Sequence, residues 1–382
     1  MTMVFDNIFN PHYWAMVPFH YWSLVFFAFG CIVGSFLNVC IYRMPLELSV
    51  VSPPSHCPHC KYAIPFYLNV PLLTWLALKG RCKNCGAPIA PRYFIVELLT
   101  GLTFLACWLT FGPRSAGLAL VYCLFLAGLI VATFIDFEHF IIPDEITLGG
   151  VVAGLVLSFF LPALHEVRTN GRGMLQGVVG AIAGAAIVYG VLRGGKLLFG
   201  RQKVKLPGET TIVFSESALC LPEKEIPYDE LFYRASDTIV FQARTLELVD
   251  RGYANAKVRL SPARLRIDEE DIAPETVAHL EAVCSELVLP REAMGLGDVK
   301  FMAAIGAFLG WQAVVFTLVV ASMIGAAYGG VMVALRKQEW SGRLYFGPFL
   351  SLAATVWVFS GPRLVAWYLQ FSNHLLDRFL TH

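Results

Sequence analysis

The sequence predicts an all-α polytopic membrane protein of about eight transmembrane helices, with a cytosolic zinc-ribbon loop and a small cytosolic insertion. Three observations indicate this fold class. Of the 382 residues, 57% are hydrophobic and 15% are charged, against roughly 25% charged residues in soluble domains. The charges are concentrated, because residues 201–292 hold 12 Lys/Arg and 17 Asp/Glu. Four cysteines form two close pairs within one polar loop.

The apolar segments give the number of spans. Most match the roughly 20 residues that a helix needs to cross a bilayer, although the segment 299–311 is short. We expect spans over residues 20–42, 93–112, 116–135, 146–163, 174–194, 299–311, 313–335 and 346–370. The chain then divides into a first segment and span (1–42), the cysteine loop (43–91), four spans (92–200), the charged insertion (201–292) and three spans (293–382).

Basic residues in the loops predict the orientation. Loop 43–92 holds six Lys/Arg and one acid, Glu47, and further basic residues follow the fifth span and precede the eighth. Loops rich in Lys and Arg stay in the cytoplasm, so both termini are expected outside. The N-terminal residues 1–20 contain no Lys or Arg, so a cleavable signal peptide of the usual kind is not expected. The net charge of +1 gives no reason to expect nucleic-acid binding.

The paired cysteines indicate a metal site. Cys57 and Cys60, then Cys82 and Cys85, form two C-x-x-C motifs, and four thiolates complete a closed tetrahedral zinc site. Disulfides are less compatible with a loop expected in the reducing cytosol. A redox role for one C-x-x-C pair is a further alternative.

Two aspartates at membrane boundaries indicate a catalytic pair. Asp298 follows Gly295 and Gly297 at the start of a long apolar run, and Asp136 ends the third span. An acid at such a boundary is costly unless it is paired, protonated or at the water edge. In the predicted topology both lie at the cytoplasmic edge, where two carboxyls can share a proton, one acting as acid and the other activating water.

The structural alternative is that each aspartate caps a helix or is a solvated interface residue. Asp144 fits the cap role best, because Pro143 and Asp144 open the fourth span. Glu138, His139 and Glu145 are expected to be interface residues.

The motifs around both aspartates resemble those of the type IV prepilin peptidase family, among the GxGD membrane aspartyl proteases. Gly295, Gly297 and Asp298, with the trailing Lys300, resemble the GxGD motif, and Asp136 followed by Pro143 and Asp144 resembles the first-aspartate motif. Further matches are Gly-Ser-Phe-Leu-Asn-Val at 34–39, Tyr-Arg-Met-Pro at 42–45, Pro-Phe-Tyr-Leu-Asn-Val-Pro at 65–71 and Gly-Pro-Phe at 347–349.

The resemblance implies a multi-pass enzyme of the bacterial inner membrane. Asp136 and Asp298 would cleave leader peptides from type IV prepilins or type II secretion pseudopilins at the cytoplasmic face, with structural zinc. It also implies N-methylation of the new N-terminus with S-adenosylmethionine, although no Gly-rich methyl-donor motif is evident. The other classes are a transporter or channel that uses its acids for ions or protons, and a zinc-ribbon scaffold without catalysis.

The insertion 201–292 has no counterpart in compact members of that family. Residues 210–214, 238–241 and 257–260 have the composition of strands, and residues 274–287 that of a helix. We expect a small α+β or β-rich cytosolic domain. It could contact secretion or pilus machinery, hold substrate, or be a tolerated insertion. Elsewhere, G-x-x-x-G spacings such as Gly180 with Gly184 predict close helix packing.

Overall fold

The computed structural model describes most of the chain. The described residues are 18–199, 201–215, 218–222, 224–232, 237–248, 251–274, 277, 279–290, 295–335 and 345–380. Two expected features therefore lie outside them, namely residues 1–17 and the basic residues of segment 336–343. The chain forms two compact units, residues 1–188 with 296–382, and residues 189–295.

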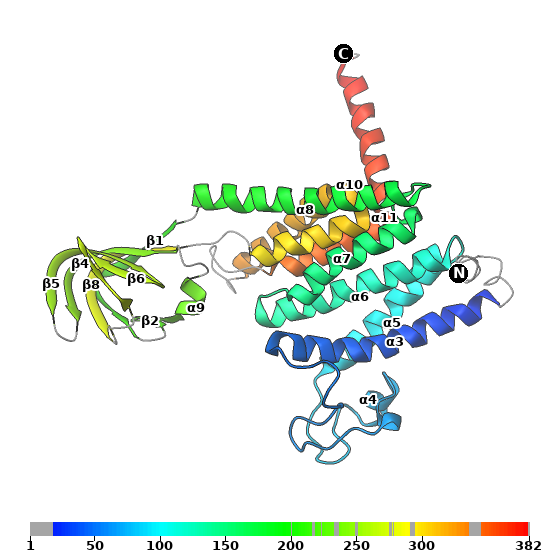
Figure 1. Cartoon of the computed structure of the whole chain (residues 1–382), viewed down its shortest axis with the longest axis horizontal. Coiled ribbons are helices and arrows are strands. Elements are labelled where there is room, and N and C mark those ends of the chain that lie inside the picture. The colour runs from blue at the N-terminus through cyan, green and yellow to red at the C-terminus, as the bar shows by residue number, and fades with distance from the viewer. Residues whose placement is uncertain are drawn as a thin grey trace. The chain divides into compact units, whose positions relative to one another are not determined.

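The first unit is built from helices (Figure 1). They are α3 (Phe19–Arg43), α4 (Leu73–Ala77), α5 (Pro91–Phe111), α6 (Ala116–His139), α7 (Asp144–Phe160), α8 (Asn170–Phe199), α10 (Leu296–Ala334) and α11 (Phe346–Leu380), with short 3-10 turns at Met44–Leu46, Phe66–Leu68 and Pro162–His165. Local signals set several boundaries. Pro91 opens α5 at a position that needs no backbone donor, and Ser115 caps α6 by accepting a hydrogen bond from Leu118 N at 3.3 Å.

Six described helices are long and apolar enough to cross a membrane: α3, α5, α6, α8, α10 and α11. This supports a polytopic membrane protein. The eight predicted spans differ from this number in two places. The fourth span corresponds to α7, which has 17 residues, and the sixth and seventh both fall within α10, which has 39.

Helix α10 contains a sharp bend at Gly310, where φ is 80° and ψ is 172°. A methyl group built on Gly306 would lie 3.0 Å from Val314 Cγ2, although eight residues of straight helix span about 12 Å. The segments 296–309 and 311–334 therefore fold back on each other. The ring pairs Tyr328–Phe349 and Phe316–Trp357 show that the second segment runs antiparallel to α11.

Glycines let the helices pack closely, as their spacing predicted. A methyl group on Gly180 would lie 2.1 Å from the carbonyl oxygen of Gly306, and one on Gly184 would lie 2.3 Å from that of Met302. Both approaches are possible only without a side chain. They bring α8 against the first half of α10.

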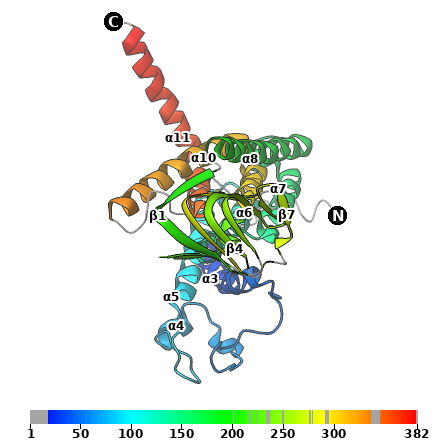
Figure 2. The same ribbon diagram turned by 90° about the vertical axis from the view of Figure 1, so that its left-hand side faces the viewer.

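The second unit is an eight-stranded antiparallel sheet (Figure 2). The strands are β1 (Arg201–Phe214), β2 (Ala218–Leu221), β3 (Lys224–Pro227), β4 (Ile239–Leu248), β5 (Gly252–Ser261), β6 (Arg264–Ile267), β7 (Glu270–Ile272) and β8 (Leu280–Pro290), in the order β3-β2-β1-β8-β4-β5-β6-β7, with a short helix α9 (Tyr228–Leu231). Ile212, Phe241, Val258 and Leu287 are among its buried core residues. The predicted strands 210–214 and 257–260 are confirmed within β1 and β5, and 238–241 is confirmed in β4 from Ile239 onward.

The predicted helix over residues 274–287 is wrong. Most of this segment belongs to β8, which pairs with both β1 and β4 in the middle of the sheet. Alternate residues Leu280, Ala282 and Cys284 are buried, with the period of two that a strand gives. Its Ala, Glu and Leu residues favour a helix locally, but burial between two strands outweighs that preference.

Candidate active site

Asp136 lies in the last turn of α6 and is buried, with 6% of its surface exposed. Its Oδ2 accepts a hydrogen bond from the backbone N–H of Gly347, in the first turn of α11, at 3.0 Å. A methyl group at Gly347 would lie 2.7 Å from that oxygen. Only glycine therefore lets the start of α11 come this close to the carboxyl.

Asp298 lies in the first turn of α10 and is half-buried. The first turn of a helix stabilises a negative charge, because the backbone N–H groups there point outward. The preceding Gly297 lies against Ile142, since a methyl group at Gly297 would be 3.7 Å from Ile142 Cβ.

Ile142 joins the surroundings of the two aspartates. Its Cδ1 would lie 3.2 Å from a methyl group at Gly347, whose N–H binds Asp136. The same side chain faces Gly297, next to Asp298. The structure therefore brings together the end of α6 and the starts of α10 and α11.

The start of α7 joins this cluster through an ion pair. Lys300 Nζ donates to Asp144 Oδ1 at 2.6 Å and to Oδ2 at 2.9 Å. Asp144 was expected to cap α7, and this is wrong. The cap position is Pro143, which makes no side-chain hydrogen bond, and Asp144 lies inside the first turn, where Lys300 can reach it.

The polar residues next to Asp136 and Asp144 are either paired with another side chain or exposed. Glu138 forms an ion pair with Arg92 at the start of α5, while His139 and Glu145 are exposed. These positions fit the interface role expected for all three. Gly295, the first residue of the GxGD motif, is exposed and precedes α10.

Two residues near Asp136 were not singled out from the sequence. Tyr345 stacks on Phe140 with ring centroids 4.0 Å apart and meets Phe137 edge-on at 5.5 Å. Ile142 gave no signal, because one more apolar residue in an apolar stretch is uninformative. Tyr345 could have been noticed from its place directly before the Phe-Gly-Pro segment.

The four cysteines Cys57, Cys60, Cys82 and Cys85 meet in one cluster. Their Sγ atoms all lie within 4.8 Å of one another, with 3.9 Å between Cys57 and Cys85 and 4.0 Å between Cys60 and Cys82. A tetrahedral zinc ion with Zn–S bonds of about 2.3 Å requires sulfur–sulfur distances of roughly 3.8 Å. A disulfide requires about 2.05 Å, so the cluster has the geometry of a metal site.

The two cysteine motifs have the same backbone turn. Lys61 N donates to Cys57 O and Gly86 N donates to Cys82 O, both at 2.9 Å, and both donors have positive φ, 58° and 71°. Asn84 Nδ2 donates to Cys60 Sγ at 3.5 Å. This hydrogen bond to Asn84 is the main reason that the pKa of Cys60 is lowered to about 6, which favours the thiolate that a metal needs.

Comparison with known proteins identifies the family to which these residues belong. Residues 28–111 match the bacterial peptidase A24 N-terminal domain, and residues 123–206 and 276–330 match the type IV leader peptidase family. A protein of Dichelobacter nodosus named prepilin leader peptidase/N-methyltransferase is 36% identical over 202 residues, which cover 46% of this chain and 67% of that protein. The chain belongs to the type IV leader peptidase family.

Other members of the type IV leader peptidase family are similar in sequence to this chain over longer or shorter aligned segments. A protein of the same name from Aeromonas hydrophila is 28% identical over 368 residues, covering 90% of this chain and 92% of that protein. One from Myxococcus xanthus is 50% identical over 134 residues, covering 35% and 39%. No solved structure matches the chain.

The matched segments contain every residue that the sequence singled out for chemistry. Asp136, Pro143 and Asp144 lie in 123–206, and Asp298 and Lys300 in 276–330. The four cysteines lie in 28–111. Residues 207–275, between the two parts of the family match, belong to the β-sheet unit.

Proposed function

We propose that this leader peptidase cleaves the leader peptides of type IV prepilins or type II secretion pseudopilins at the cytoplasmic face of the bacterial inner membrane. The observation that carries the proposal is the meeting of the two aspartate motifs around Ile142 and Gly347. The names of the relatives, prepilin leader peptidase/N-methyltransferase, supply the substrate class.

The chemistry follows from two carboxyls that share one proton. The ionised member of Asp136 and Asp298 takes a proton from water, whose oxygen adds to the carbonyl carbon of the scissile peptide bond. The protonated member then donates its proton to the leaving nitrogen as the C–N bond breaks. The Gly347 N–H holds Asp136 in one orientation, so the carboxyl is positioned before substrate arrives.

Lys300 and Asp144 are proposed as positioning residues. Their ion pair connects the first turns of α10 and α7, and so fixes the helix start that carries Asp298. Both side chains are substantially exposed, at 39% and 58%, so the pair contributes on the order of 1 kcal/mol or less to stability.

The cytoplasmic orientation is supported by charge. The loop between α3 and α5 carries six basic residues counted from Arg43 to Arg92, and such loops remain in the cytoplasm. The described hydrogen bonds place the end of α6 and the starts of α5 and α11 together. We propose that all these ends lie on the cytoplasmic side, with eight crossings in total.

Two further groups belong to the proposal. Zinc would be held by Cys57, Cys60, Cys82 and Cys85, whose sulfur geometry fits it, and would stabilise the loop without an open ligand position. S-adenosylmethionine would supply a methyl group to the new N-terminal amine. For the β-sheet unit we propose contact with secretion or pilus machinery, which its own core and its place between the family-matched segments support.

Separate Asp136→Asn and Asp298→Asn variants test the peptidase proposal. Purified full-length protein in detergent is incubated with a purified prepilin, and leader removal is followed on gels. Each variant should lose about a thousandfold or more in cleavage rate, because the reaction needs both carboxyls and removing either one disables the pair. Glu145→Gln, an exposed carboxylate at the same helix ends, is the matched control. Wild-type cleavage by either aspartate variant would exclude the paired-aspartate mechanism, whereas absence of cleavage by the wild-type protein itself would favour the transporter or scaffold alternatives.

A further inference from the structure

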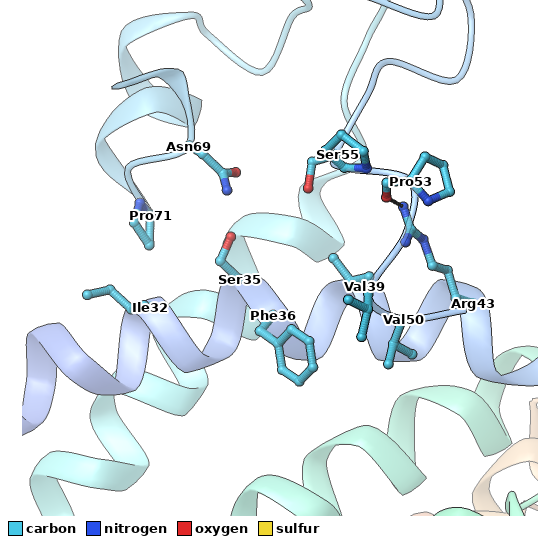
Figure 3. Close-up of a pocket in the computed structure, with 12 residues that line it drawn as sticks. Ile32, Ser35, Phe36, Val39, Arg43, Val50, Pro53, Ser55, Asn69 and Pro71 are labelled. Atoms are coloured by element: carbon cyan, nitrogen blue, oxygen red, sulfur yellow. Dashed lines mark hydrogen bonds between the residues drawn. The ribbon is translucent and has the colours of Figure 1, made fainter. Parts of the chain in front are cut away.

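Basic side chains outside the aspartate cluster differ in whether they have partners. Arg43, which lines a cavity beside α3 (Figure 3), donates from Nη1 to Ser49 O at 2.9 Å and from Nη2 to Pro53 O at 2.7 Å. The β-sheet unit is different, because six basic side chains gather on one of its faces. Four of them form no ion pair with a carboxylate among the described residues. Such a face favours an anionic partner from outside the unit.

The pairing register of the strands places these basic residues on one side of the sheet. Directly opposite residues of neighbouring strands have their side chains on the same side. One row of opposite residues crosses β1, β8, β4, β5 and β6, and consists of Lys203, Val288, Val240, Arg259 and Arg266. Neighbouring strands are about 4.8 Å apart, so the row is about 19 Å long.

Three more basic residues lie two positions from this row on β1, β5 and β6, and therefore share its side of the sheet. The residues between them point the other way, since Val258 and Leu265 are buried in the core of the unit. We call the six residues, all of them exposed, the basic face. They are Lys203, Lys205, Lys257, Arg259, Arg264 and Arg266.

The charges of the unit are segregated. Residues 201–292 hold 17 acidic and 12 basic residues, yet half of the basic ones share this face, and the acidic segment 268–271 lies at the β7 edge of the sheet. Arg259 and Arg266 lie directly opposite each other, and opposed like charges destabilise a sheet. An external anion would offset this repulsion.

The described ion pairs neutralise little of the basic face. Lys203 lies 3.3 Å from a carboxylate oxygen of Glu286, and Arg266 lies 3.9 Å from one of Asp271. All four side chains are at least 42% exposed, and exposed pairs of this kind are weak. The other four basic residues of the face remain available to an anion.

The basic face lies at the end of the sheet that the chain joins to membrane helices. Strand β1 begins two residues after α8 ends at Phe199, and β8 ends at Pro290, six residues before α10 begins. Both helices are long and apolar enough to cross a membrane. Lys203 follows Phe199 by four residues, a distance of at most about 14 Å. The covalent connections therefore hold the row that contains Lys203 within reach of the bilayer surface.

We propose that the basic face binds anionic phospholipid headgroups of the membrane that α8 and α10 cross. Headgroup phosphates supply the negative charges that the face lacks, and the arginines can bind them through two parallel hydrogen bonds. Attachment at both chain ends raises the effective concentration of headgroups to about the millimolar range, so several weak contacts suffice. An acidic protein would also match the charges, but the position of the face beside two membrane attachments favours lipid. Leader cleavage plays no part in this interaction.

Energy transfer from the sheet to the bilayer tests this proposal in the full-length protein. A fluorescent amino acid replaces Ala254, an exposed residue toward the opposite end of the strands, and headgroup-labelled lipid in nanodiscs is the acceptor. Binding through one face lays the strands along the bilayer, because side chains stand perpendicular to a sheet. Transfer should therefore be greater with about 30% phosphatidylglycerol than with phosphatidylcholine alone. Sodium chloride at about 0.5 M should remove the difference, because it shortens the screening length to about 4 Å.

Two double variants show whether the basic face is responsible. Arg259→Gln with Arg266→Gln removes two charges from it and should weaken docking by about fivefold for each charge removed. Arg244→Gln with Arg251→Gln is the matched control. It removes the same number of charges from the same unit, but these two side chains already pair with carboxylates, so the increase in transfer should remain. Thermal unfolding checks the fold of each variant.

Loss of the phosphatidylglycerol effect in the Arg259 and Arg266 variant alone, with a native unfolding temperature, supports lipid binding by this face. Equal transfer in the two kinds of nanodisc overturns it, and the acidic surface of a protein would then be the better match. An increase that survives in the Arg259 and Arg266 variant, or that both double variants lose alike, also overturns it. Cleavage of prepilin by the same proteins is measured separately, so a failure of lipid binding leaves the proposed function untouched.

Discussion

The position of Asp136 depends on a glycine in another helix, 211 residues along the chain. The Gly347 N–H that holds Oδ2 lies in the first turn of α11, where N–H groups have no partner within their own helix. A carboxylate satisfies such a donor and is oriented by it. The sequence motif identified both residues separately, but their hydrogen bond follows only from how the helices pack.

Gly347→Ala should therefore impair catalysis more than stability. The added methyl group would lie 2.7 Å from Asp136 Oδ2, so the carboxyl must rotate or α11 must shift. We expect leader cleavage to fall by about a hundredfold, the scale of effect that a shift of about 1 Å can have on catalysis. Gly149→Ala in α7 is the control, because nothing lies within 4 Å of its added methyl. Wild-type kcat in Gly347→Ala would show that the hydrogen bond does not position Asp136.

The ion pair between Lys300 and Asp144 predicts that substitutions of the two residues have non-additive effects on kcat/KM. If it positions the start of α10, Lys300→Met and Asp144→Asn should each lower kcat/KM by about three- to tenfold, and the double variant should lose no more than either single one. Steady-state cleavage rates of the four proteins measure this. Fully additive losses would mean that the two side chains act separately.

At the scale of elements, sequence patterns predicted most of the membrane helices. They did not predict the bend in α10 or the strand β8. Long apolar runs predict spans because the bilayer demands their length, and α3, α5, α6, α8 and α11 agree with that expectation. The bend at Gly310 requires a positive φ. The sequence contains 32 glycines, and nothing in it indicates which of them has this backbone conformation. Strand β8 was mistaken for a helix because its paired residues lie 32 to 48 positions away in β4 and 66 to 89 positions away in β1.

The bend at Gly310 predicts a turn on the outer side of the membrane. If segment 296–309 crosses outward and segment 311–334 returns, alkaline phosphatase fused after residue 311 should be active, because this enzyme folds only outside the cytoplasm. A fusion after Gly208 in the β-sheet unit should be inactive, and β-galactosidase fusions should give the opposite pattern. An inactive phosphatase at residue 311 would mean that α10 does not cross and return, and the eight-crossing topology would be wrong.

At the scale of the whole molecule, the cysteine cluster draws together residues on both sides of α4 and so closes a long loop. Metal binding to a site of this type contributes directly to folding. Cys60→Ser should therefore lower protein abundance in membranes together with zinc content, whereas Cys220→Ser in the β-sheet unit should change neither. Mass spectrometry of metal content and quantitative immunoblotting measure both. Normal abundance in a zinc-free variant would exclude a structural role for the metal.

The β-sheet unit should be removable without loss of chemistry. Its first and last strands pair directly, with Arg201 opposite Pro290, so the two chain ends lie about 5 Å apart. A Gly-Ser linker of a few residues can therefore replace residues 201–290 without pulling on α10. The contacts of Asp136 with Gly347, and of Ile142 with Gly297, lie wholly within the first unit.

We expect the shortened protein to cleave purified prepilin within about threefold of the wild-type rate, because the described contacts around Asp136 and Gly297 are made by residues of the first unit. A fall in processing in cells, with the purified rate unchanged, would support a contact between this unit and the secretion or pilus machinery. A loss of more than tenfold in the purified reaction, in a variant that still melts cooperatively, would instead make the sheet part of the substrate site.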